Sequence, residues 1–71
     1  MRVDLSIRVE DALTEMPPEG RQEILETIAA VLVRRDAWPR PGGWEAARSF
    51  APRSWMAFSA YLDGIDVGYV G

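Results

Sequence analysis

The C-terminal eighteen residues, Ser54 to Gly71, have the pattern of a β-hairpin. Asp63-Gly64 is the expected turn, because a two-residue Asp-Gly loop can adopt the positive φ angles of a type I′ turn. Counted outward from this turn, the expected pairs are Leu62–Ile65, Tyr61–Asp66, Ala60–Val67, Ser59–Gly68, Phe58–Tyr69 and Ala57–Val70. Alternate pairs point to opposite sides, which gives one apolar face and one mixed face. The sequence therefore predicts a sheet with one face on a core and the other at least partly free.

Length and composition limit the chain to a single small domain, residues 1–71. It has 71 residues, no Cys and no His. The usual zinc ligands are therefore missing, and no metal or cofactor is predicted. A chain of this length buries only about 60% of its unfolded surface. Extra stability could come from a homodimer or from a bound partner.

The charge pattern separates an acid-rich segment, Glu10–Glu26, from a later part of the chain that carries most of the arginines. The formal net charge is −3 and all eight basic residues are Arg, which argues against strong nonspecific binding to nucleic acid. The sequence is compatible with a local basic patch, because five arginines lie after the N-terminal third: Arg34, Arg35, Arg40, Arg48 and Arg53. No N-terminal apolar run is long enough for a signal peptide or a membrane span. We therefore expect a cytoplasmic protein without membrane contacts.

Hydrophobic spacing predicts two helices in the first half of the chain. Alternation over residues 1–8 indicates a leading strand. A short helix over Glu10–Met16 should end at Pro17-Pro18, since the residue before a proline avoids the helical region. A longer helix over Glu19–Arg35 follows, and Pro18 can serve as an early residue of it.

The second half of the chain is predicted to be a loop followed by three strands. The loop covers Asp36–Gly43, and a strand over Glu45–Ala51 places Ala47 and Ser49 opposite Arg48 and Phe50. With the C-terminal hairpin, the order becomes β-α-α-β-β-β. The predicted fold class is α+β, with a helical hairpin packed on a three- or four-stranded antiparallel sheet.

Two segments and this element order carry a resemblance to a known family. Residues 16–25, Met-Pro-Pro-Glu-Gly-Arg-Gln-Glu-Ile-Leu, break the helical hairpin, and residues 64–71, Gly-Ile-Asp-Val-Gly-Tyr-Val-Gly, close the strand meander. Over nearly its whole length the chain resembles the RelE/ParE superfamily of bacterial toxins. Ser54–Phe58 falls where that family has Tyr-Arg-Val-Ile-Tyr, and Val70-Gly71 falls where it has the start of Val-Gly-His-Arg.

The resemblance implies the toxin half of a type II toxin–antitoxin pair, neutralised by a cognate antitoxin. Its target would be translation, through messenger RNA cleavage on the ribosome, or DNA gyrase in the ParE branch. In ribosome-dependent members, basic and aromatic residues on the sheet position the RNA phosphate and assist attack by the ribose 2′-hydroxyl. Here Trp55 stands where the family has Arg, and the sequence stops at Gly71, before the family's His-Arg. A toxin-like protein that has lost catalysis is therefore one alternative.

Three residues are the candidate catalytic residues. Arg48 and Arg53 could contact phosphate, or they could form salt bridges with Asp63, Asp66 or Glu45. Tyr61 is expected on the free face opposite Asp66, whereas Tyr69 is expected on the core face. The predicted catalytic set is therefore Arg48, Arg53 and Tyr61.

Three tryptophans are the candidate partner-binding residues. Trp38 lies within the predicted loop and Trp44 directly follows it, and both could instead cover the edge of the core. Trp55 could stack on a base, dock a partner or pack under the N-terminal segment. A second hypothesis follows from these three side chains. In it, the chain is a non-enzymatic interaction module, dimeric or bound to a larger protein.

Overall fold

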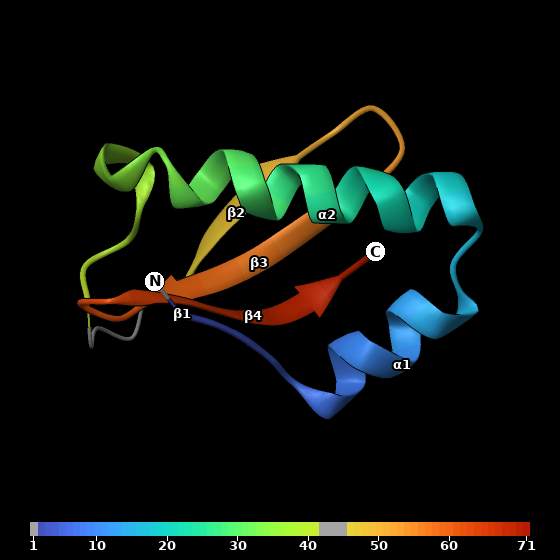
Figure 1. The fold of residues 1–71 in the computed structure, drawn as a ribbon, viewed down its shortest axis with the longest axis horizontal. Helices are drawn as coiled ribbons and strands as arrows, with labels where there is room; N and C mark the ends of the chain where they lie inside the picture. Colours follow the sequence, from blue (N-terminus) through green and yellow to red (C-terminus); the bar gives the residue numbers. More distant parts are fainter. Residues whose placement is uncertain (1, 42–45) are drawn as a thin grey trace.

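A computed structural model describes residues 2–41 and 46–71, and it has the predicted order of elements (Figure 1). Its strands and helices are β1 (Arg2–Leu5), α1 (Ile7–Glu15), α2 (Pro18–Leu32), the short 3₁₀ helix η1 (Arg35–Ala37), β2 (Ala47–Phe50), β3 (Trp55–Ala60) and β4 (Gly64–Val70). The α+β class and the packing of two helices on a sheet are confirmed. Three predictions fall outside the described residues: the start of the Glu45–Ala51 strand, the Gly42-Gly43 end of the loop, and Trp44.

The four strands lie in the order β1-β4-β3-β2, and the sheet is mixed. The prediction of a purely antiparallel sheet is wrong at one edge, because β1 runs parallel to β4 and pairs Val3 with Ile65. Two neighbouring parallel strands require a long crossover connection, and the chain from α1 to β3 supplies it. Nothing in the four-residue β1 segment itself encodes the direction of its partner.

The hairpin turn lies one residue earlier than predicted. The Tyr61 N–H donates to the Gly64 carbonyl at 2.8 Å, so Leu62 and Asp63 are the central residues. Ala60 consequently pairs with Ile65, two positions away from the predicted partner. The φ of Gly64 lies outside the left-handed region, and a Cβ at this position would overlap the Arg2 carbonyl of β1. The glycine is therefore needed for the close approach of β1, which the type I′ prediction did not include.

A β-bulge near the end of β4 changes which residues face the core. Phe58 pairs with Val67 and Ala57 pairs with Tyr69, so Gly68 is the extra residue. A bulge of this kind rotates the following residues to the other side of the strand. Tyr69 is consequently 52% exposed on the outer face, and the prediction that it faces the core is wrong.

The start of α1 is also earlier than predicted. The Ser6 hydroxyl accepts a hydrogen bond from the Val9 N–H at 3.1 Å, which satisfies one of the free donors at a helix N-terminus. The alternation that predicts a strand through Arg8 therefore ends at Leu5, and Ile7 is the first helical residue. Pro18 is the first residue of α2, as predicted.

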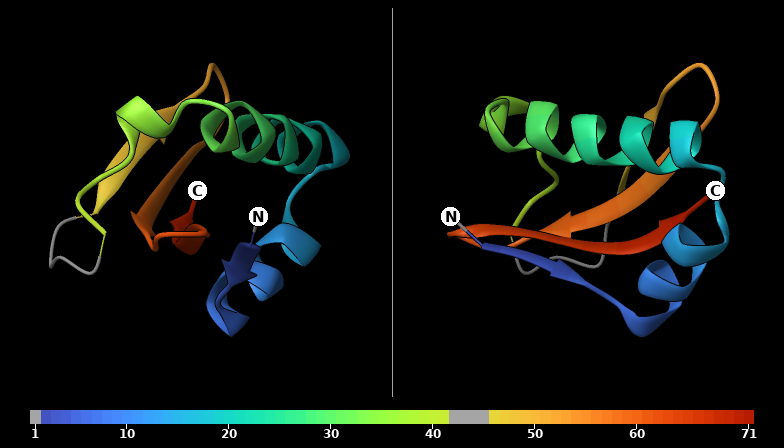
Figure 2. Two further views of the ribbon diagram at one scale, coloured as in Figure 1. Left: turned by 60° about the vertical axis from the view of Figure 1, so that its left-hand side comes forward. Right: turned by 45° about the vertical axis from the view of Figure 1, so that its right-hand side comes forward.

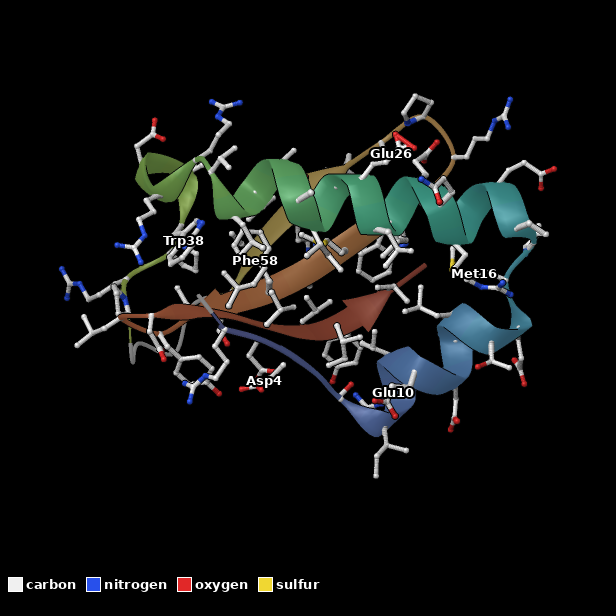
Figure 3. The ribbon with its side chains drawn as sticks, in the orientation of Figure 1. Asp4, Glu10, Met16, Glu26, Trp38 and Phe58 are labelled. Carbon is white, nitrogen blue, oxygen red and sulfur yellow. The ribbon has the colours of Figure 1, made fainter. Side chains whose placement is uncertain are left out.

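The core lies between the inner face of the sheet and the two helices (Figure 2). Nine buried residues form it: Val9, Leu13, Ile24, Ile28, Val31, Met56, Phe58, Ile65 and Val67. Phe58 and Trp38 lie between α2 and the sheet, whereas Glu26 points away from it (Figure 3). The outer face of the sheet has neither helix lying across it (Figure 2).

The molecule has two distinct ends along β4. At the turn end, the β3–β4 turn lies near Arg2 and near η1, because the Arg2 N–H donates to the Asp63 carbonyl at 2.7 Å and the Arg35 side chain donates to the Leu62 carbonyl at 3.3 Å. At the open end, Gly71 and Trp55 exchange two backbone hydrogen bonds of 2.9 and 3.0 Å. The two candidate surfaces described below lie at these two ends.

Candidate functional site

The outer face of the sheet carries a group of aromatic and arginine side chains at the open end. The register places Arg48 beside Ala57, and Ala57 beside Tyr69. In the next row Phe50 lies beside Trp55. We call the group formed by Arg8, Arg48, Phe50, Trp55 and Tyr69 the outer-face patch.

Ser6 and the β-bulge position one corner of this patch. The Ser6 hydroxyl, which caps α1, also donates to the carbonyl of Gly68 at 3.3 Å. This contact ties the first turn of α1 to the bulge that turns Tyr69 outward. Arg8, in that first turn, places its guanidinium carbon 4.7 Å from the centre of the Tyr69 ring, a cation–π distance.

The remaining rings of the patch lie on β2 and β3. Phe50 is 75% exposed on β2, an edge strand in the described sheet. Trp55 is half-buried, and its indole occupies the space where a Cβ on Gly71 would lie. Ala57 is buried although it faces outward, which indicates that larger side chains around it cover this small residue. The patch therefore combines two guanidinium groups with three aromatic rings around the small side chain of Ala57.

The three predicted catalytic residues do not form one cluster. Arg48 is exposed on β2 within the outer-face patch, whereas Arg53 lies in the β2–β3 turn. Tyr61 lies at the turn end, separated from Arg53 by the length of β3, roughly 20 Å for six residues. In this arrangement the three residues cannot act together on one phosphate. Of the three, Arg48 belongs to the outer-face patch.

Arg53 takes part in a contact that the sequence did not reveal. Its backbone N–H donates to the Glu23 carboxylate at 2.9 Å, and the buried Ser54 hydroxyl donates to the same oxygen at 2.6 Å. The Ser54 hydroxyl, followed by the Arg53 N–H, lowers the pKa of Glu23 from its ordinary value. This clasp fixes the β2–β3 turn against α2. Local sequence patterns could not predict this clasp, because Glu23 and Arg53 lie 30 residues apart.

Two predicted residues from different sets meet in a cavity at the turn end. Trp38 and Tyr61 line a hollow of about 290 Å³ together with Arg35, Arg40 and Leu62. We call this hollow the η1 pocket. The Trp38 Nε1–H donates to the Val31 carbonyl at 2.7 Å, so its ring is both held by α2 and packed against the core. Of the predicted partner-binding tryptophans, Trp38 and Trp55 thus lie at opposite ends of the sheet, and Trp44 is outside the described residues.

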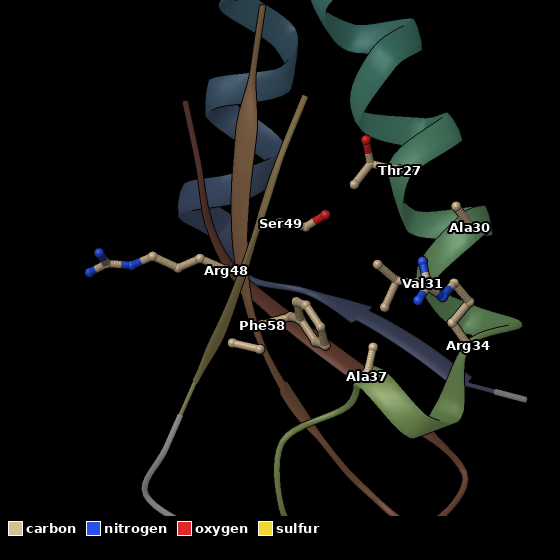
Figure 4. Close-up of a pocket in the computed structure, with 9 residues that line it drawn as sticks. Thr27, Ala30, Val31, Arg34, Ala37, Arg48, Ser49 and Phe58 are labelled. Atoms are coloured by element: carbon tan, nitrogen blue, oxygen red, sulfur yellow. The ribbon is translucent and has the colours of Figure 1, made fainter. Parts of the chain in front are cut away.

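A second hollow, of about 280 Å³, lies between α2 and β2 (Figure 4). Thr27, Val31 and Phe58 line it, and Arg34 lies at its rim. Arg48 points away from it, toward the other side of β2. Arg48 nevertheless belongs to the lining of the hollow, so the hollow and the outer-face patch meet at this residue.

Neither a metal cluster nor a membrane-spanning helix is found within residues 2–41 and 46–71. No group of three or more acidic side chains there is arranged to hold a metal ion. The helices in these ranges are too short or too polar to cross a membrane. Compared with known proteins, the chain matches no family model, no curated protein and no solved structure.

Proposed function

We propose that this chain is a toxin-like component of a type II toxin–antitoxin system that acts on its target by binding. The observation that carries the proposal is the outer-face patch, where Arg48 lies among exposed rings on a sheet face that neither helix covers. The order of elements along the whole chain agrees with the order on which the RelE/ParE resemblance rests. That agreement supports the proposal but leaves the target to experiment.

The patch has the chemistry of a binding surface for phosphate and planar groups. Guanidinium groups form charge-assisted hydrogen bonds to phosphate, and aromatic rings stack on bases or fill pockets of a protein partner. A cleavage reaction through the ribose 2′-hydroxyl also needs a proton acceptor near the phosphate. The chain has no His, and the ionisable groups of the patch are two guanidiniums and one phenol. Inhibition by binding, on the ribosome or on DNA gyrase, therefore fits the patch better than RNA cleavage.

Induced expression in a bacterial host tests this proposal. The wild-type chain should arrest growth, and coexpression of a cognate antitoxin should restore it. The double variant Arg48→Ala plus Tyr69→Ala should lose the arrest, because it removes one cation and one ring from the patch. Arg34→Ala is the matched control, since Arg34 is exposed and lies outside the patch. Absence of arrest by the wild-type chain would contradict the proposal.

A second candidate function is a non-enzymatic interaction module that forms a homodimer. The observation in its favour is the position of Phe50, which is 75% exposed on a strand at the edge of the described sheet. Edge strands offer unpaired backbone groups to another chain, and an exposed ring adds apolar area to such a contact. Sedimentation analysis should then show a dimer that Phe50→Ser converts to a monomer. A wild-type monomer over a range of concentrations would exclude this function.

A further inference from the structure

The η1 pocket brings together two segments that are far apart in the sequence. One wall comes from η1 and the residues after it, and the other comes from the β3–β4 turn. Arg35 joins the walls, because its Nη2 donates to the Leu62 carbonyl at 3.3 Å. The position of this turn depends on Gly64 and β1, so the pocket exists only in the folded sheet.

The aromatic side chains of the pocket are held in fixed orientations. The Trp38 indole is anchored by its hydrogen bond to the Val31 carbonyl, and the Arg35 guanidinium carbon lies 5.1 Å from its ring centre. On the Tyr61 side, the Arg2 guanidinium carbon lies 4.3 Å from the ring centre. Rings that are oriented in advance lose little entropy when a flat ligand stacks on them.

The guanidinium groups of three arginines lie against the η1 pocket, in segments that also carry Asp4, Asp36 and Asp63. Three guanidinium groups surround the two rings, although the net charge of the protein is −3. Arg2 forms ion pairs with Asp4 at 3.5 Å and with Asp63 at 3.4 Å. Within residues 2–41 and 46–71, Arg35 and Arg40 form no ion pair. Their positive charge is therefore available to an anion.

We propose that the η1 pocket binds a nucleotide, with the nucleobase against Trp38 and Tyr61 and the phosphate on Arg35 and Arg40. Phosphate suits guanidinium groups because their planar donors can form paired hydrogen bonds to its oxygens. A flat base suits the aromatic walls because stacking is tolerant of base identity. The volume of about 290 Å³ is near the lower limit of small-molecule pockets, which suits one nucleotide. The nucleotide can be free or can be one unit of a single-stranded RNA.

This pocket does not depend on the proposed toxicity. It lies at the turn end, whereas the outer-face patch lies at the open end. Arg40→Gln should therefore weaken nucleotide binding in the η1 pocket while leaving growth arrest by the outer-face patch unchanged. Arg48→Ala should have the opposite pair of effects.

Titration calorimetry with defined probes tests the proposal on the full chain. The probes are adenosine monophosphate, adenosine, inorganic phosphate and a short single-stranded oligoribonucleotide. Arg40→Gln should weaken binding of adenosine monophosphate about tenfold, which is the effect of losing one charge-assisted hydrogen bond. Trp38→Phe should also weaken it, and Arg34→Gln, the neighbouring exposed arginine outside the pocket, should not.

The source of the nucleotide follows from the same titrations. Binding of adenosine monophosphate would support a free nucleotide, and binding of the oligoribonucleotide alone would support an RNA strand. The proposal is overturned if neither probe binds the wild-type chain. It is also overturned if inorganic phosphate binds as tightly as adenosine monophosphate, because the rings would then contribute nothing. Binding that survives Arg40→Gln and Trp38→Phe but is lost in Arg48→Gln would place the ligand on the outer face and would likewise refute the pocket. Circular dichroism of each variant establishes that it is folded.

Discussion

At the turn end of β4, a Cβ on Gly64 would overlap the Arg2 carbonyl of β1, whereas at the open end Gly68 has no neighbouring atom within 4 Å of the corresponding position. The same residue type therefore has two different roles in one strand. Gly64 permits the close approach of a parallel neighbour. Gly68 is the extra residue of a bulge, and it decides which side chains face outward.

The two ends of β4 therefore contribute differently to stability and to the candidate surfaces. The turn end is constrained by hydrogen bonds from the Arg2 backbone and from the Arg35 side chain to the β3–β4 turn, and the η1 pocket depends on them. The open end is less constrained at Gly68, and the bulge there places Tyr69 under Arg8 on the outer face. A change at Gly64 should therefore affect the whole fold, and a change at Gly68 should affect mainly the outer-face patch.

The largest expected effect is that of Gly64→Ala. The added methyl would overlap the backbone of β1, which cannot move aside like a flexible side chain. We expect the free energy of unfolding to fall by about 3 kcal/mol, the upper range for overpacking. Urea unfolding followed by circular dichroism measures this change.

Gly68→Ala is the matched control for that measurement. A Cβ at this position meets open space, so we expect a loss of at most about 1 kcal/mol. Equal losses for the two variants would break the comparison, because they would show that both glycines have the same role.

A second prediction compares two residues of β4 that the predicted register places on one face. Val67 is buried in the core, whereas Tyr69, beyond the bulge, is on the outer face. Val67→Ala should lower the free energy of unfolding by about 2 kcal/mol, since it removes buried apolar groups. Tyr69→Ala should lower it by less than about 1 kcal/mol, because an exposed cation–π contact contributes little.

Tryptophan fluorescence during urea unfolding can measure both variants under the same conditions. A larger loss for Tyr69→Ala than for Val67→Ala would mean that the chain has no bulge at Gly68 in solution. The predicted register, with Tyr69 on the core face, would then be correct.

The prediction of the core was correct between the turn and the bulge, even though the predicted register there was wrong. Between the turn and the bulge, the observed pairing of β3 and β4 differs from the predicted one by two residues, and a shift by two keeps each side chain there on its own face. Phe58, Ala60 and Ile65 were therefore assigned to the inner face correctly. Leu62 was assigned there wrongly, because it lies in the turn and is exposed.

The remaining errors have two different physical causes, one nonlocal and one local. The parallel pairing of β1 depends on the approach of Arg2 to Gly64, two residues from opposite ends of the chain. Alternation of Val3, Leu5 and Ile7 predicted a strand, and the capping bond of Ser6 ended it earlier. The Ser6 cap is a local signal that the strand prediction overlooked, whereas the parallel pairing of β1 is not encoded by any local pattern.

The candidate surfaces were predicted less completely than the fold. Trp38 and Tyr61 were both selected from the sequence, but in different roles, since their meeting depends on where the turn lies. Arg48 and Phe50 were correctly placed on one side of β2, opposite Ala47 and Ser49. Arg8 was missed, because only the bulge brings Tyr69 beneath it. The roles of these residues stay predictions.

The smallest expected effect concerns the pH dependence of the clasp at the open end. The hydrogen bonds from Ser54 and Arg53 lower the pKa of Glu23 in the folded protein. The folded state therefore favours the carboxylate more than the unfolded state does. This contribution to stability is complete above the ordinary glutamate pKa of 4.5 and is lost as the pH falls through the lowered pKa.

Between about pH 6 and about pH 3, the Glu23→Gln variant should therefore lose less stability than the wild-type chain, because it has no carboxylate at this position to protonate. Urea midpoints at the two pH values measure the loss. Glu26→Gln is the matched control, since Glu26 is exposed on the same helix and points away from the sheet (Figure 3). If both variants reduce the loss equally, the effect comes from the general charge of α2. If only Glu23→Gln does so, the clasp is the pH-sensitive contact of the open end, and Ser54→Ala should weaken the same dependence.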